Sequence, residues 1–457
     1  MKRYAGIAVT FIAILTGSSK LQAAGFALTE HNSSGLGRAY AGAAAVADDA
    51  STIFFNPAGL VTLKKDQLLF STQAILVGAE FHNNGSTVNP QLTGGADVPI
   101  SDGGSNEGGE NALVPSFYYS AVINDSLALG VGVSVPFGLA TKYDEDWVGR
   151  YHAVESAVET ININPTIAYK LNKEWSFGFG VNLQHLDVKL SNMIDTAAVC
   201  LRSAGATVCG NINTALLQAG NADIDSKVSL TGSEWGYGYN FGVIYEPSAG
   251  NRIGFSYRSK ISYDIDGNAD FDLSDEMAIF LAAVSSPYFS DTGGKAKLVL
   301  PEIASLAGRF QVSNNLALLA DITWTRWSRF KELRVEFENG QSETVIPENW
   351  GNSIKIAFGG DYRLNNLWLL RAGIAYDKTP IPDSEHRTAR IPATSRKVFS
   401  LGLQHKITKK VKIDAGYVHL FIDDPEINNV DSSFGHTLNG NYSSSVDIFG
   451  AQLTWDL

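Results

Sequence analysis

The sequence of 457 residues lacks several features that would place it in a common class of protein. After the first 23 residues, no run approaches the roughly 20 consecutive apolar residues of a membrane-spanning helix. The net charge of −12 argues against nucleic acid, which needs a basic face. The eight histidines show no metal-ligand spacing, and no nucleophile stands beside a candidate base. We therefore expect no enzymatic activity, no metal and no cofactor.

The one long apolar run lies at the N-terminus. Lys2 and Arg3 precede it, the run covers residues 5–16, and a small residue stands at Ala23. This order is typical of a secretory signal peptide, and the run is short for the alternatives, a membrane anchor or a buried helix. The sequence predicts that residues 1–23 are a signal peptide, removed after Ala23 on export.

Cysteine is nearly absent. The only two, Cys200 and Cys209, lie nine positions apart in one long polar connection. An even number of cysteines in an exported chain favours a disulfide. We expect Cys200 and Cys209 to form one that ties this connection.

What the sequence has in abundance is alternation. In "WGYGYNFGVIY" the large apolar residues share one face, while glycine and Asn240 share the other; "TININPTIAYKL" and "SIKIAFGGDYRL" follow the same pattern. In "RIGFSYRSKISYDI" it puts Ile253, Phe255, Ile261 and Tyr263 on one face. A period of two marks strands with one apolar and one polar face.

The phase of this alternation slips at two places. One slip is near Gln184 and His185, and the other is near Arg326 and Trp327. An extra residue in one strand of a pair would produce such a slip. We expect β-bulges at both places.

Strand length and spacing indicate a membrane barrel. Many segments run to about 10 residues, the length that crosses a bilayer, rather than the usual 5–6. Short polar turns alternate with long loops, as in outer-membrane barrels. Six such turns are recognisable, at 124–125, 172–173, 248–251, 314–315, 365–366 and 409–410. With a hairpin partner at each end, they predict an all-β fold: a closed, 14-stranded antiparallel transmembrane β-barrel over residues 66–457.

Residues 24–65 do not have the pattern of a strand. They are rich in alanine and glycine and carry Arg38, Asp48 and Asp49, charges that are costly in lipid but can pair inside a lumen. A barrel of this size is too wide for its own side chains to fill. We expect residues 24–65 to form a hatch domain that plugs the barrel.

The same segment carries a family resemblance. "SGLGRAYAG", "ADDAS" and "NPA" closely resemble the mature N-terminus of the FadL-type long-chain fatty acid transporters (OmpP1/FadL/TodX), which include channels for toluene, xylene and related hydrocarbons. "WVGRY", "NPTIAYKLN" and "LPE" extend the resemblance along the chain. It implies a 14-stranded barrel with an N-terminal hatch, in agreement with the strand count.

The resemblance also implies a passive route in the bacterial outer membrane. A hydrophobic ligand would enter an apolar groove between loops 191–226 and 273–292, reach a pocket at the mature N-terminus, and leave sideways into the outer leaflet. Leu216, Leu217 and the run "MAIFLAAV" would line the groove. The alternative is that these two loops simply pack on each other.

Two sets of residues are carried over from the family at the N-terminus. Phe26 and Leu28 would form the pocket, unless they only anchor the terminus. Asn56, Pro57 and Ala58 would act as the gate of the hatch and contact the third strand from inside.

The third strand, "LALGVGVSVPFGLA", would provide the lateral exit. Glycine marks a bulge or a close backbone approach in a strand, and proline cannot donate to the ladder. We expect Gly130, Gly132, Pro136, Phe137 and Gly138 to form a kink where the wall is unpaired. The alternative is that Pro136 only ends the strand at its outer rim.

The predicted function is passive uptake of hydrophobic compounds, first long-chain fatty acids and second aromatic or alkane hydrocarbons. A surface adhesin or receptor and a general porin are the alternatives. Expected contacts are the ligand, outer-membrane lipid and lipopolysaccharide, with the chain a monomer. A carboxylate ligand would need a cation, and Arg258, Lys260, Arg309, Lys331 and Arg334 are candidates, none preferred.

Overall fold

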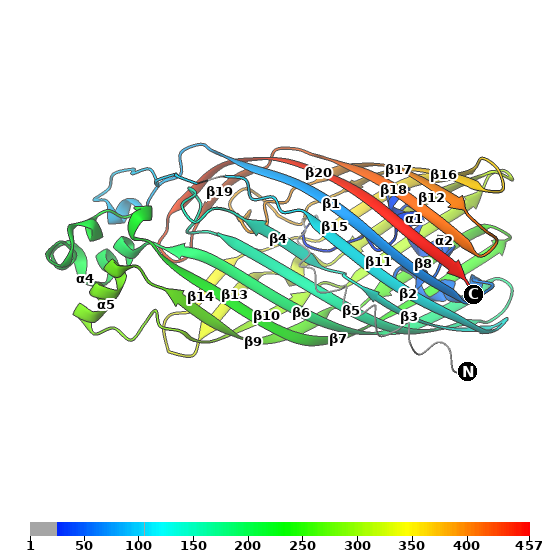
Figure 1. The fold of residues 1–457 in the computed structure, drawn as a ribbon, viewed down its shortest axis with the longest axis horizontal. Coiled ribbons are helices and arrows are strands. Elements are labelled where there is room, and N and C mark those ends of the chain that lie inside the picture. Colours follow the sequence, from blue (N-terminus) through cyan, green and yellow to red (C-terminus); the bar gives the residue numbers. More distant parts are fainter. Residues whose placement is uncertain (1–24, 105) are drawn as a thin grey trace.

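A single antiparallel sheet closes on itself to form a barrel in the computed structural model, which describes residues 25–104 and 106–457 (Figure 1). Closure joins the first strand, β1 (Gln67–Asn83), to the last, β20 (Thr437–Asp456), along the whole length of β1. The expected signal peptide lies outside the described residues.

The wall consists of 14 strands, as predicted. Eight are continuous: β1, β2 (Ala112–Asn124), β5 (Glu155–Lys170), β6 (Trp175–Ile194), β7 (Ser226–Ser248), β16 (Trp368–Asp377), β17 (Arg396–Lys406) and β20. The other six are each interrupted once, giving β3 (Leu127–Ser134) with β4 (Gly138–Lys142), β8 (Asn251–Arg258) with β9 (Ile261–Asp272), β10 (Thr292–Leu300) with β11 (Ile303–Gln311), β12 (Leu316–Thr325) with β13 (Glu332–Phe337), β14 (Thr344–Pro347) with β15 (Ser353–Arg363), and β18 (Val411–Ile422) with β19 (Glu426–Val430).

The two ends of the barrel differ. All six predicted short turns lie at one end, called here the short-turn end, together with the C-terminus (Figure 1). The long connections and two helices, α4 (Thr196–Ile212) and α5 (Asp275–Val284), lie at the other, the loop end. Cys200 and Cys209 are joined by a disulfide within α4. Among the described residues, no helix is long and apolar enough to cross a membrane.

A belt of exposed apolar side chains surrounds the wall. Its members come from strands all round the barrel, for example Leu129, Ile167, Phe179, Tyr239, Phe255, Leu306, Leu318, Phe358, Ile374, Leu401, Ile413 and Phe449. The belt does not reach the loop end. On β6 the outward residues change from Phe179 and Val181 to Asp187 and Lys189, which are polar and exposed. The loop-end part of the barrel therefore extends beyond the apolar belt.

The bulge predicted at Gln184 and His185 is wrong. The pairing of β6 with β7 runs through both residues without a shift. The side chains change instead: beyond His185 the apolar residues Leu186 and Leu190 point inward. What looks like a phase slip in the sequence is the point where the wall leaves the apolar belt and its inner face becomes apolar.

Two other expectations about phase also need correction. Ile253 and Phe255 are exposed, whereas Ile261 and Tyr263 are buried, because the register on β7 shifts by one residue between β8 and β9. Near Trp327 the structure has a strand interruption with a 3-10 turn, η6 (Trp327–Arg329), rather than a bulge.

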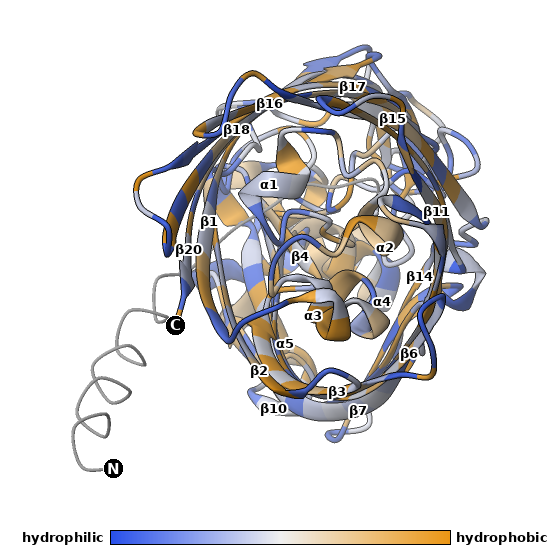
Figure 2. Ribbon diagram, turned by 90° about the vertical axis from the view of Figure 1, so that its right-hand side faces the viewer, coloured by the Kyte–Doolittle hydropathy of each residue, from blue (hydrophilic) through white to orange (hydrophobic). Residues whose placement is uncertain are grey.

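The N-terminal segment fills the lumen. Three short helices, α1 (Ser33–Leu36), α2 (Ala43–Val46) and α3 (Thr52–Phe55), lie within the ring of strands, followed by the 3-10 segment η2 (Pro57–Thr62) (Figure 2). α1 contacts β17, β18 and β20, α2 contacts β8 and β11, and η2 contacts β5, β6 and β7. The segment is therefore held from nearly all sides, and residues 25–65 are called the hatch below.

A buried ionic network fixes the hatch to the wall. Arg38 Nη1 lies 2.8 Å from Asp361 Oδ2 of β15, and Arg38 Nη2 lies 3.3 Å from Asp48 in the hatch itself. Arg371 of β16 adds a contact of 2.5 Å to Asp414 of β18. Both arginine side chains are almost fully buried, so each needs its partners.

Replacing Arg38 with glutamine should loosen the hatch without disrupting the barrel. Loss of one partner from a buried ion pair costs about 3–5 kcal/mol, and here the cost falls on docking of the hatch. We expect faster amide exchange over residues 33–62 in Arg38→Gln. Arg396→Gln is the matched control, because Arg396 pairs with Asp377 on the wall. Equal exchange in Arg38→Gln and the wild type would contradict this account.

Candidate functional site

The start of the hatch, residues 26–28, pairs with the start of β4 through backbone hydrogen bonds. Leu28 N donates to Pro136 O at 2.8 Å, and Gly138 N donates to Phe26 O at 2.9 Å. Ala27 and Phe137 form an antiparallel bridge between these two bonds. These three residues, called the tail below, therefore hydrogen-bond to the third strand from inside.

The tail stands where the wall itself is unpaired. β2 pairs with β3 as far as Val133, and in the described part of the chain no ladder joins β2 to β4. β3 and β4 pair with β5 in registers that differ by one residue, Ser134 opposite Asn162 but Gly138 opposite Glu159. One extra residue at Pro136 therefore bends the third strand away from β2.

The unpaired stretch between β2 and β4, called here the opening, lies at the edge of the apolar belt that faces the loop end. By register, Leu113 of β2 would face the bend if the pairing continued, and its side chain is exposed on the outer face. Ile161 of β5 is the last exposed apolar residue on that strand before Glu159. A molecule that passed through the opening would thus emerge beside apolar surface.

The glycines of the third strand serve close packing rather than the bend. Gly130 and Gly132 both sit in regular ladders. A Cβ on Gly130 would lie 2.7 Å from Ile53 Cδ1 of the hatch, and one on Gly132 would lie 2.8 Å from Tyr118 Cδ1. Their lack of a side chain lets the hatch approach the wall.

Asn56, Pro57 and Ala58 pack closely on strands other than the third, although the 3-10 segment that begins at Pro57 also contacts β3. Asn56 Nδ2 donates to Val243 O of β7 at 3.1 Å and to Phe255 O of β8 at 3.2 Å. Pro57 and Ala58 pack so closely on β6 that no side chain fits at Gly178. The triplet thus joins the hatch to β6, β7 and β8, and Ile53 and Leu60 face the third strand.

Phe26 sits in an aromatic cluster at the end of a cavity. Its ring centroid lies 4.8 Å from that of Trp327, 5.8 Å from Phe330, 6.0 Å from Trp350 and 6.1 Å from Phe137. The strand interruptions place these rings together, since Phe137, Trp327 and Trp350 lie between strand segments. One face of Phe26 borders the cavity described next.

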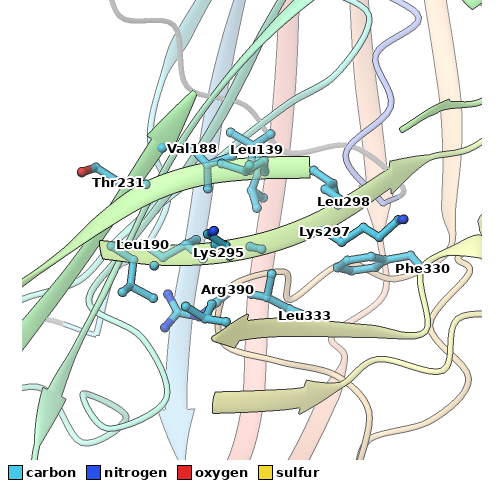
Figure 3. A pocket seen from close by; sticks show the side chains of 18 of the residues that line it. Leu139, Val188, Leu190, Thr231, Lys295, Lys297, Leu298, Phe330, Leu333 and Arg390 are labelled. Carbon is cyan, nitrogen blue, oxygen red and sulfur yellow. The ribbon is translucent and has the colours of Figure 1, made fainter. Parts of the chain in front are cut away.

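The cavity, called here the Phe26 chamber, has an empty volume of about 880 Å³, part of it open to solvent. Its walls are almost wholly apolar and include Leu139, Val158, Val188, Leu190, Leu230, Ile265, Leu298, Leu333 and Val335 (Figure 3). Leu298 points inward while Lys297 is exposed on the outside. The chamber therefore lies in the part of the barrel beyond the apolar belt, where the inner face of the wall is the apolar one.

Arg390 is the cation of the chamber. It comes from the loop between β16 and β17, which folds into the barrel. Its Nη1 donates to Ser156 Oγ at 3.0 Å and Ser191 O at 3.2 Å, and its Nη2 donates to Asn192 Oδ1 at 3.2 Å. Nε has no partner, and none of the ion pairs among the described residues involves Arg390. In the described part of the chain, no carboxylate thus lies within ion-pair distance of this buried positive charge.

Glu348 is the other ionisable group on the chamber wall with a buried side chain. Trp350 Nε1 donates to its Oε2 at 2.9 Å. Burial raises the pKa of Glu348 to about 8, so it is mostly protonated at neutral pH. Burial lowers the pKa of Arg390 to about 10, which leaves it charged. The chamber therefore carries a net positive charge at neutral pH.

A groove at the loop end continues into the chamber. It has an empty volume of about 1780 Å³, open to solvent, and shares Leu190, Leu230, Leu333, Val335 and Arg390 with the chamber. Parts of both predicted loops line it, such as Val199 and Tyr288, but so do residues 340–346 and 432–434, which the sequence did not suggest. Arg390 stands at the junction of groove and chamber.

The two predicted groove segments also pack on each other. Met277, Phe280 and Leu281 of α5 are buried in one cluster with Cys200, Cys209 and Leu216. Leu217 and Ile279 remain exposed. The run "MAIFLAAV" thus mainly covers α4, in line with the alternative given above.

Other sequence candidates lie apart from the chamber. Leu28 borders a different cavity, together with Arg258. Lys260 and Lys331 are exposed, and Arg334 is paired with Glu332 and Glu343. Arg309 donates to Gly250 O and Gln311. The sequence does not indicate Arg390 as a site residue, because its loop has no strand pattern and nothing in it predicts that the loop folds into the barrel.

Comparison with known proteins identifies relatives over nearly the whole chain. The family described as "Outer membrane protein transport protein (OMPP1/FadL/TodX)" matches residues 14–457. A long-chain fatty acid transport protein of Escherichia coli O6:H1 is 31% identical over 420 residues, 89% of this chain and 90% of its own. Outer membrane protein P1 of Haemophilus influenzae is 32% identical over 461 residues, 97% of each chain. The crystal structure of a Pseudomonas aeruginosa FadL homologue, 26% identical, superposes with a TM-score of 0.83 over 94% of this chain and 99% of that one.

Proposed function

This chain belongs to the OMPP1/FadL/TodX family of outer-membrane transport proteins, and we propose that its ligand is a long-chain fatty acid that leaves the barrel sideways. It is a bacterial outer-membrane β-barrel that transports hydrophobic compounds, and it is not an enzyme. The proposal concerns the identity of the compound and its path.

The path begins in the groove at the loop end. The acid enters the Phe26 chamber chain first, and its carboxylate stops at Arg390, at the junction with the groove. The chain then packs along Val188 and Leu298 and reaches Phe26.

The chain end competes with Phe26 for the aromatic cluster. Moving the tail breaks the two backbone hydrogen bonds that hold it to β4, each worth about 0.5–1.5 kcal/mol. Burial of the acyl chain contributes about 0.8 kcal/mol for each CH₂ group, so a long chain offsets this cost. Once the tail moves, the opening between β2 and β4 is free, and the acid passes to the outer leaflet.

The observation that carries the choice of ligand is Arg390. A carboxylate would satisfy its unpartnered Nε, whereas a neutral hydrocarbon would leave the charge unpaired. The test is expression of the chain in cells without their own transporter, followed by uptake of labelled oleate and labelled toluene. We expect oleate to accumulate. Uptake of toluene but not of oleate would favour the hydrocarbon alternative, and uptake of neither compound would indicate a receptor.

Binding of a permanently charged ligand should weaken as the pH rises through about 8. Protonated Glu348 does not repel an anion, but its carboxylate does, and its pKa is about 8. A C16 alkyl sulfonate is the right probe, because its own charge is constant over this range. Glu348→Gln should make the affinity independent of pH between 6 and 9. A pH profile unchanged by that substitution would contradict this role.

A further inference from the structure

A separate cavity lies on the other side of the tail, between the hatch and strands β8, β11, β12 and β15. It has an empty volume of about 690 Å³, partly open, and is called here the hatch cavity. Phe26 borders the chamber, whereas Leu28, two residues later, borders the hatch cavity. The tail is therefore a partition between two cavities.

One side of the hatch cavity is apolar. Leu28, Tyr40, Phe54, Phe55 and Pro57 supply it, all from the N-terminal segment. Phe54 and Phe55 are in edge-to-face contact at 5.3 Å, and Tyr40 lies 5.7 Å from Phe55. This is a continuous aromatic surface, which suits an acyl chain.

Charged side chains of β8, β12 and β15 also border this cavity, and the guanidinium of Arg258 stacks on its aromatic surface, 4.2 Å from the centre of the Phe54 ring. Arg258 Nη2 donates to Phe54 O at 3.1 Å, and Nη1 donates to Asn182, both neutral acceptors. Lys355 Nζ lies 5.2 Å from the centre of the Tyr40 ring. Asp321 accepts from Thr323 at 2.7 Å and Ser305 at 3.1 Å.

No ion pair among the described residues includes Arg258, Lys355 or Asp321. Two cations and one carboxylate thus border the same space, and Arg258 is only 7% exposed. An unpaired charge as buried as that of Arg258 is costly, so a counter-ion is expected, and the partly exposed Lys355 stands beside the same space. The excess is positive, and the ligand should be an anion.

From these observations we propose that the hatch cavity is a second binding site for an amphipathic carboxylate. Its carboxylate lies beside Lys355 and Arg258, and its chain lies on Phe54, Phe55 and Leu28. The proposal takes its ligand class from the proposed function, but the site is distinct from the chamber. Because the tail lies between the two sites, acid bound at either one contacts it.

The direct test is a crystal of the wild-type protein soaked with a 16-carbon fatty acid that carries bromine on its last carbon. We expect two anomalous bromine peaks, one in the Phe26 chamber and one against Phe54 and Phe55. Native mass spectrometry in a nonionic detergent should show two acids bound to each chain. Bromine confined to the chamber, with one acid bound, would overturn the proposal, and this test needs no variant.

Variants then separate the two sites. Lys355→Gln should weaken binding in the hatch cavity by about tenfold or more and leave the chamber peak in place. Lys397→Gln is the matched control, because Lys397 is exposed on the outer wall and pairs with Asp423. A hatch-cavity peak unchanged in Lys355→Gln would overturn the charge argument. Loss of oleate uptake or of the chamber peak bears on the proposed function instead, so the two failures are distinguishable.

Discussion

Deletion of Pro136 should close the wall and reduce fatty acid uptake to background while the barrel still assembles. The registers of β3 and β4 on β5 differ by one residue, so removal of one residue makes them continuous. Ser134 and Leu139 both keep their inward orientation after the deletion, because the alternation is restored at the same time. The start of β4, which now pairs with the tail, can then pair with Ala112 to Val114 of β2, while the far end of β4, where Thr141 bridges Gly109, shifts by one residue.

The control for this deletion is Pro136→Ala. It removes the proline but keeps the extra residue, so the register difference and the opening remain, and we expect at least half of the uptake. Assembly is checked by resistance of the folded barrel to unfolding in sodium dodecyl sulfate without heating. Normal uptake by an assembled deletion variant would show that the acid leaves by another route. Loss of uptake in Pro136→Ala would mean that the proline itself is required.

The sequence predicts features that depend on near neighbours in the chain. Alternation and turn residues gave the 14 strands, and the Val-Pro-Phe-Gly stretch gave the place of the bend, because a proline restricts pairing whatever lies around it. The same alternation cannot tell which face of a strand meets lipid. It puts Ile261 and Tyr263 on the same face as Ile253 and Phe255, although Ile261 and Tyr263 line the interior beyond the apolar belt.

Contacts between distant segments were out of reach for a different reason. Asn56 hydrogen-bonds to β7 and β8, which follow it by almost 200 residues, and nothing near Asn56 specifies that choice. Arg390 becomes a chamber residue only because its loop folds back over Ser156 and Ser191. The position of the Arg390 charge therefore depends on the closed barrel and cannot be predicted from its neighbours in the chain.

Arg390→Gln should weaken oleate binding by about 10–100-fold. A hydrogen bond to a charged group is worth about 1.5–3 kcal/mol, and each 1.4 kcal/mol corresponds to about tenfold in affinity. Methyl oleate, which has the same chain without the charge, should lose less than about twofold. The measurement is the ratio of the two dissociation constants by fluorescence titration of the purified protein.

Arg390 also supports the fold of its loop, and the comparison of acid with ester separates that role from contact with ligand. If Arg390 only holds the loop against Ser156, Ser191 and Asn192, its loss should weaken acid and ester equally. Arg390→Lys should recover part of the preference for the acid, since the charge remains. Arg387→Gln is the matched control, a buried arginine of the same loop that donates to backbone carbonyls and does not line the chamber. An unchanged ratio in Arg390→Gln would remove the reason to prefer a fatty acid over a hydrocarbon, because no other buried cation borders the chamber among the described residues.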